Sequence, residues 1–218
     1  MNKTHNHIQR ITGIAMFAAL AYACAVICHF NIPQIAGFLS LDVKDSLIAI
    51  ASFIYGPITA PIIALLVSFI EFVTISSTGW WGFVMNFASS TVFSLTASLI
   101  YKYKKSFTSA LVGFFIAIFA TTGIMVLLNI WITPIYYGMP RSAVIPMVKF
   151  PILPFNIAKS LMNSAIALLL YKPIITALRM AGIIKKGKHK TDFNKFTVIT
   201  IAVGGVSLIA AILILISL

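Results

Sequence analysis

Charged side chains are scarce in this sequence, and acidic ones most of all. Only 9% of the 218 residues are charged, 60% are hydrophobic, and only four are Asp or Glu. Soluble domains carry about 25% charged residues, so the composition excludes an ordinary soluble protein and predicts an integral membrane protein. Several apolar runs reach the roughly 20 residues that cross a bilayer as a helix. The alternating pattern of a membrane β-barrel is absent.

Cysteine is also scarce. Cys24 and Cys28 are four residues apart on one face of the first apolar run, where we expect packing rather than a disulfide. That run follows the basic residues Lys3 and Arg10, and "AYACA" resembles a signal-peptide cleavage site. Because residues 11–30 are long enough to span the membrane, we expect them to be retained.

The apolar runs predict an all-α, polytopic membrane helical bundle. A six-helix core occupies residues 1–180, a basic loop residues 181–195, and a seventh C-terminal helix residues 196–218. Gly56-Pro57 ends the short second run and predicts a tight hairpin with the third. The expected helices are 11–30, 43–55, 57–76, 83–101, 108–129, 155–178 and 196–218.

The basic residues predict the orientation of the bundle. With the N-terminus in the cytoplasm, most of the 16 Lys and Arg lie on the inner side, as the positive-inside rule requires. The net charge of +12 therefore needs no nucleic-acid partner. The inner residues are Lys3, Arg10, Lys102, Lys104, Lys105, Lys172, Arg179, Lys185, Lys186, Lys188, Lys190 and Lys195.

Two stretches without a helical pattern are expected on the outer side, at 31–42 and 130–154. The second holds four prolines and several aromatic residues, which fit either an interfacial aromatic belt or a lid over a binding site. On the inner side, "GIIKKGKHK" matches part of a phosphate-binding loop. His189 replaces the Ser or Thr that holds Mg²⁺ and no strand precedes it, so we interpret these lysines as topological.

Polar side chains form stripes on otherwise apolar helices. Asn156, Lys159 and Asn163 lie on one face of the sixth predicted helix, and Asn86 begins a similar stripe on the fourth. Asn129 lies at the outer end of the fifth. Such groups either join helices or line a site for a neutral, hydrogen-bonding solute. Lys159 either faces the bundle interior or extends its ammonium group to the membrane surface.

Two of the four acids stand three residues apart at the start of the second helix. Asp42 suits the N-cap and Asp45 the third helical position, where carboxylates favour the helix dipole. A ligand role for Asp42 is the alternative. Asp42 is the better candidate of the two because it closes the predicted outer loop.

The first helix carries a different pattern. Ala15, Ala19 and Ala23 recur every four residues, which allows another helix to approach closely. The partner is either a helix of this bundle or another subunit.

These stretches together resemble the substrate-binding S component of energy-coupling factor (ECF) vitamin transporters, particularly its riboflavin-specific branch. The resemblance runs from about Ile11 to Leu178. Besides the alanine stripe, it rests on "FLSLDVKDSLIAIASFIYGPITAP", "GFVMNF", "LLNIWITPIYYG" and "PFNIAKSLMNSAIALLLYKPI".

The resemblance implies a function and its partners. It implies a non-enzymatic subunit of a prokaryotic cell membrane that binds riboflavin, as transported ligand rather than cofactor, in an outward-facing pocket without a metal. It further implies a membrane coupling subunit docked on the alanine stripe and two cytoplasmic ATPases. The implied vitamin site comprises Phe38, Leu41, Asp42, Asn86, Asn129 and Lys159.

Three positions depart from the family pattern. Phe83 stands where Glu is usual, Glu71 where a basic residue is common, and the helix at 196–218 lies beyond the usual six. Another vitamin or a related flavin is therefore an alternative ligand. A membrane enzyme is disfavoured because His29 and Glu71 have no evident catalytic partner in the sequence, and a self-sufficient transporter because no internal repeat is evident.

Overall fold

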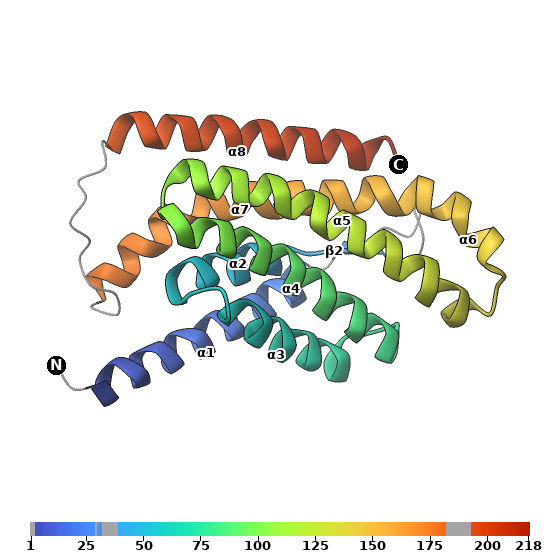
Figure 1. Ribbon diagram of the computed structural model, residues 1–218, viewed down its shortest axis with the longest axis horizontal. Helices are drawn as coiled ribbons and strands as arrows, with labels where there is room; N and C mark the ends of the chain where they lie inside the picture. The colour runs from blue at the N-terminus through green and yellow to red at the C-terminus, as the bar shows by residue number, and fades with distance from the viewer. Residues whose placement is uncertain (1–2, 29, 32–38, 182–192) are drawn as a thin grey trace.

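The computed structural model describes residues 3–28, 30–31, 39–181 and 193–218. Its helices lie side by side in an elongated bundle (Figure 1). A short antiparallel pairing of β1 and β2 matches Phe30 with Leu41. The elements are α1 (Lys3–Ile27), β1 (Phe30–Asn31), β2 (Ser40–Leu41), α2 (Lys44–Tyr55), α3 (Thr59–Thr74), α4 (Gly79–Lys104), α5 (Phe107–Tyr137), α6 (Arg141–Met147), the π-helical turn η1 (Val148–Ile152), α7 (Leu153–Met180) and α8 (Phe193–Ile216).

The membrane bundle predicted from composition is confirmed. Within the described part of the chain, five stretches are long and apolar enough to cross a bilayer, and they lie in α1, α4, α5, the α6–α7 segment and α8. The short helix α3 is apolar but falls below that length. The predicted hairpin is also confirmed, since α2 ends at Tyr55 and Gly56 adopts a φ of 103°, which favours glycine.

Helix α2 forms the centre of the bundle. Its side chains are buried without a break from Lys44 to Phe53, and α1, α3, α4 and α7 all contact it. A 12-residue helix is about 18 Å long, so α2 cannot cross about 30 Å of hydrocarbon. Its first turn is buried inside the protein, so its free amides need partners from other side chains.

The predicted N-cap on α2 is wrong. Val43 occupies the cap position and contributes no side-chain hydrogen bond, and Asp45 lies in the first turn. The cap comes from α7 instead, because the Ser46 amide donates to Asn163 Oδ1 at 2.9 Å. The Asn163 amide nitrogen in turn donates to the Asp42 carbonyl at 3.0 Å. A residue distant in sequence thus satisfies the buried helix end.

The predicted outer loop at 130–154 is also wrong. Helix α5 continues to Tyr137 with Pro134 inside it, and α6, η1 and α7 follow after Gly138. Proline is tolerated inside membrane helices, and Pro140 immediately precedes α6, close to the N-terminal position that proline favours. Similarly, α4 begins at Gly79, four residues before the predicted start.

The alanine stripe faces outward. Phe17, Ala21 and Ala25 are the buried side of α1, whereas Ala15 and Ala19 are exposed and Ala23 is half-buried. Packing within this bundle therefore does not explain the stripe. Cys24 and Cys28, on the same helix, are free thiols as expected.

The C-terminal helix α8 packs along α7. The contact is close, because a Cβ on Gly204 would meet Leu169 Cγ at 2.9 Å. The outer face of α8 is exposed and apolar. Figure 1 places α8 and α1 at opposite edges of the bundle. Most of the expected basic loop at 181–195 lies outside the described residues.

The Asn163 cap generates a stability prediction. Replacing Asn163 with Leu leaves the Ser46 amide and the Asp42 carbonyl buried without their partner, which should lower the free energy of unfolding by roughly 2 kcal/mol. We expect a clearly lower melting temperature in detergent. The matched control is Ser164→Ala, because Ser164 is buried on the same helix but bonds only to its own helix, at Ser160. Equal melting of the two variants would contradict the cap assignment.

Candidate functional site

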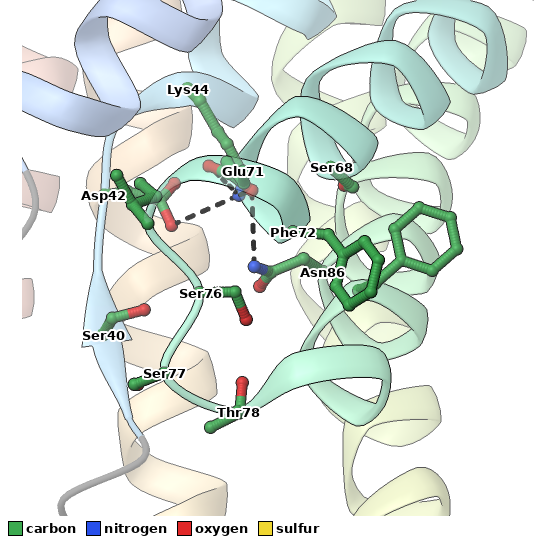
Figure 2. A pocket seen from close by; sticks show the side chains of 12 residues that line it. Ser40, Asp42, Lys44, Ser68, Glu71, Phe72, Ser76, Ser77, Thr78 and Asn86 are labelled. Atoms are coloured by element: carbon green, nitrogen blue, oxygen red, sulfur yellow. Dashed lines mark hydrogen bonds and ion pairs between the residues drawn. The ribbon is translucent and has the colours of Figure 1, made fainter.

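A buried ion-pair cluster lies where β2 meets α2. Lys159 Nζ, from α7, is 2.7 Å from Asp42 Oδ2. Lys44 Nζ donates to both carboxylate oxygens of Glu71 on α3, at 2.7 and 2.5 Å. Lys44 also lies 3.8 Å from Asp42, as Figure 2 shows. Each of these residues is at most 8% exposed, so the charges are neutralised by each other rather than by water.

The cluster decides between the two interpretations of Lys159. Its ammonium group is not extended to the membrane surface; it is buried against Asp42 and lies 3.5 Å from the Ser40 carbonyl oxygen. An ammonium group has three N–H donors. Lys159 can therefore hold Asp42 and still donate to a molecule beside it.

Asp45 is near these ion pairs, but within the described residues its side chain bonds to another helix instead of to a lysine. Its Oδ1 accepts from the Ser90 hydroxyl at 2.5 Å, and Ser94 Oγ lies 3.4 Å from its carbonyl oxygen. The polar stripe on α4 therefore joins α4 to α2. Asp45 joins α2 to α4 in this structure, and Asp42 is the acid that binds Lys159.

A cleft opens between β2, α4, α5 and α7. The space between its walls, counted out into the solvent at its mouth, is about 710 Å³. Aromatic, methionine and polar side chains mix on its wall, and we call it the aromatic cleft. Its lining residues are Leu39, Ser40, Thr78, Trp81, Gly82, Met85, Asn86, Ser89, Met125, Ile132, Thr133, Tyr136, Tyr137, Phe155, Asn156 and Lys159.

A second cleft of about 480 Å³ adjoins the first and shares Ser40, Thr78 and Asn86 with it. Its wall is rich in hydroxyl groups, and we call it the serine cleft. Figure 2 shows Asp42, Lys44 and Glu71 on this wall. It is lined by Ser40, Asp42, Lys44, Ser68, Glu71, Phe72, Ile75, Ser76, Ser77, Thr78, Phe83 and Asn86.

The structure brings several of the predicted site residues together. Asn86 and Lys159 both line the aromatic cleft, and Asp42 is bonded to Lys159 behind it. Leu41 lies next to Asp42 at the end of β2 and is half-buried. Phe38 lies outside the described residues.

Asn129 is placed differently from the others. It is fully buried, its amide nitrogen donates to the Met125 carbonyl at 2.7 Å, and its Oδ1 accepts from the Thr133 hydroxyl at 2.9 Å. Thr133, not Asn129, is the one of these two that lines the aromatic cleft. Asn129 therefore supports the wall in this structure, and its contact with a ligand stays a prediction.

Sequence reasoning missed the partnership of Lys44 and Glu71. Glu71 was expected to stand alone, yet it binds Lys44 and accepts from Asn86 Nδ2 at 3.3 Å. A signal was present, because the two residues are nearly equidistant from the Gly56-Pro57 turn and oppose each other in an antiparallel hairpin. The cleft residue Trp81 was missed because it falls in a stretch that was not predicted as helix, whereas Tyr136 belongs to the stretch predicted as either an aromatic belt or a lid.

Comparisons with known proteins show the family of the chain. The family of ECF transporter substrate-specific components matches residues 9–171. The riboflavin transporter RibU of Staphylococcus aureus (strain TCH60) is 30% identical over 177 residues, which are 78% of this chain and 93% of the relative. The riboflavin transporter FmnP of Bacillus subtilis (strain 168) is 26% identical over 188 residues, 81% of this chain and 98% of the relative.

A solved structure shares the fold. It is titled as the structure and mechanism of the S component of a bacterial ECF transporter, and it superposes with a TM-score of 0.70 at 32% identity over 79% of this chain and 99% of its own. The helix α8 begins after the residues that the family model matches. The chain belongs to the family of ECF transporter substrate-specific components, multi-pass membrane proteins, with α8 added to the part that the family shares.

Proposed function

We propose that the aromatic cleft binds riboflavin, or a closely related flavin, for import. The observation that carries the proposal is the pairing of an ammonium and an amide, Lys159 and Asn86, on a wall that also holds Trp81 and Tyr136. A flavin is a flat aromatic ring system with carbonyl and N–H groups along one edge, and such a wall offers both stacking and hydrogen bonds. The names of the two relatives support this ligand.

In this proposal Lys159 donates a charge-assisted hydrogen bond to a flavin carbonyl. Asp42 positions the ammonium group, and Asn86 contributes a neutral hydrogen bond. Leu41 and Phe38 belong to the segment that closes over the ligand. Riboflavin is the cargo, and we propose no resident cofactor or metal. Another vitamin is the alternative cargo.

The proposed orientation places the N-terminus in the cytoplasm. The exposed residues Lys102, Lys104 and Lys105 cluster where α4 turns into α5, which the positive-inside rule assigns to the inner face. The cleft residues Trp81 and Tyr136 lie at the opposite ends of these two helices. The cleft therefore faces outward in this orientation.

The proposed partners are a membrane coupling subunit and two ATPases on the cytoplasmic side. The exposed Ala15 and Ala19 support docking of the coupling subunit on α1, because small residues allow helix backbones to approach closely in lipid. ATP hydrolysis by the partners would then drive release of the vitamin inward.

The first prediction from the proposed function concerns the ligand. We expect the purified protein in detergent to bind riboflavin in the nanomolar range and to quench its fluorescence, because the ring stacks on aromatic side chains. A fluorescence titration measures both. Binding of another B vitamin without flavin quenching would move the chain to a different cargo.

The second prediction concerns Lys159. Replacing it with Met removes a charged hydrogen bond and should weaken riboflavin binding by at least about 1.5 kcal/mol, roughly tenfold. Lys149→Met is the matched control, because Lys149 is exposed outside the cleft. Since Lys159→Met also takes from Asp42 its short contact and leaves only Lys44 at 3.8 Å, the double variant Asp42→Asn/Lys159→Met should fold better and still bind weakly. Full affinity in either variant would remove Lys159 from the site.

The third prediction concerns docking. Replacing Ala19 with Trp places a bulky ring on the proposed contact, so we expect loss of riboflavin uptake in a riboflavin auxotroph that supplies the partners. Riboflavin binding by the purified variant should be unchanged. Leu20→Trp is the control, since Leu20 is exposed beside the stripe. Normal uptake with Ala19→Trp would place the coupling surface elsewhere.

A further inference from the structure

Glu71, on the wall of the serine cleft, holds two side chains at once. Its carboxylate accepts two hydrogen bonds from Lys44, at 2.7 and 2.5 Å, and one from Asn86 Nδ2 at 3.3 Å. Glu71 is itself 5% exposed and lies on α3. Figure 2 shows it between Lys44 and Asn86. No role in ligand binding follows for Glu71 from the sequence alone.

The two lysines of the cluster divide the carboxylates between them. Lys44 is held by Glu71, and its Nζ is 3.8 Å from Asp42, beyond hydrogen-bond distance. Asp42 therefore gives its short contact, 2.7 Å, to Lys159. If Glu71 lost its charge, Asp42 would be the nearest carboxylate to both ammonium groups. The two ammonium groups would then share the Asp42 carboxylate, whose Oδ1 has no hydrogen-bond partner among the described residues and could accept from Lys44.

Glu71 also fixes the direction of the Asn86 amide. A carboxylate only accepts hydrogen bonds, so the NH₂ group of Asn86 must face it. The Asn86 carbonyl oxygen is left for the shared wall of the two clefts. The wall therefore presents an acceptor from Asn86 and a donor from Lys159.

We propose that Glu71 is a positioning residue for the ligand cleft. Because Glu71 binds Lys44, Asp42 can hold Lys159 alone. Because Glu71 also binds the Asn86 NH₂ group, the Asn86 carbonyl oxygen is the group that faces the clefts. The proposal concerns the cleft to which riboflavin binding is assigned above, and in that respect it rests on the proposed function. The division of charges that it describes exists without any ligand and can be tested separately.

The first test uses the ligand-free protein. Melting temperatures in detergent are compared for the wild type, Glu71→Gln, Lys159→Met and the double variant. Glu71→Gln should lower the melting temperature of the wild type, because two ammonium groups then share Asp42. In the Lys159→Met background, Glu71→Gln should not lower the melting temperature further. Lys44, released from residue 71, can then pair with Asp42, which has lost its contact with Lys159. The same loss in both backgrounds would overturn the proposal.

The second test measures riboflavin affinity. Glu71→Gln should weaken binding about tenfold or more, because Lys159 and Asn86 lose their fixed positions. Adding Lys44→Met removes the competing ammonium group and should restore affinity to within about threefold, since a buried ion pair can be replaced by neutral residues. That rescue is not expected if Glu71 only stabilises the fold.

The matched control is Asp45→Asn. It converts a carboxyl group of the same buried region to an amide, but Asp45 bonds to Ser90 instead of a cleft residue, so affinity should stay within about threefold of wild type. Unchanged affinity in Glu71→Gln, or no rescue by Lys44→Met, would refute the positioning role. If the wild type binds no flavin, the proposed cargo is wrong, and the melting experiment alone decides the role of Glu71.

Discussion

The Asp42–Lys159 ion pair is the contact on which the cleft side of this bundle depends. It joins the start of α2 to α7 across 117 residues of sequence. Breaking a buried pair leaves an uncompensated charge, which is strongly destabilising, and more so where lipid replaces water. Asn163, one turn further along α7, bonds to the backbone on either side of the same junction. Helix α7 therefore fixes the start of α2 by a charge and an amide together, and the cleft wall is built on that junction.

The short length of α2 explains why polar residues gather there. Its first turn ends inside the protein, so its free backbone groups need side-chain partners. At its other end the packing is aromatic: Phe53 stacks on Tyr101 with ring centroids 4.3 Å apart, and the Tyr101 and Tyr171 hydroxyls lie 2.6 Å apart. The two ends of α2 thus differ: buried charges and amides surround its start, and stacked rings surround its end. Both clefts adjoin the start of α2, where donors and acceptors for a ligand are present.

The sequence predicted the helical bundle and the hairpin, and it placed both Asn86 and Lys159 in one site. These features could be predicted because hydropathy, turn residues and helical spacing are local signals. The cap on α2 could not, since Asn163 was recognised only as part of a stripe and its partner lies far away in sequence. The segment after Asn129 was predicted as a loop because it contains several prolines, which usually end helices in soluble proteins. In a membrane protein, proline is tolerated inside a helix that other helices surround, and any helix accepts it near its start. The Lys44–Glu71 ion pair could have been predicted only by aligning the two helices of the hairpin about the Gly56-Pro57 turn.

The added helix α8 restricts how a partner subunit can approach. It covers α7 along a close contact at Gly204, and it lies at the edge of the bundle opposite α1 (Figure 1). A large apolar partner could therefore reach α7 from that side only by displacing α8. On α1, the small exposed side chains of Ala15 and Ala19 leave the backbone accessible. In the proposed complex the coupling subunit accordingly meets the α1 edge, while α8 stays against α7 and faces lipid with its apolar side.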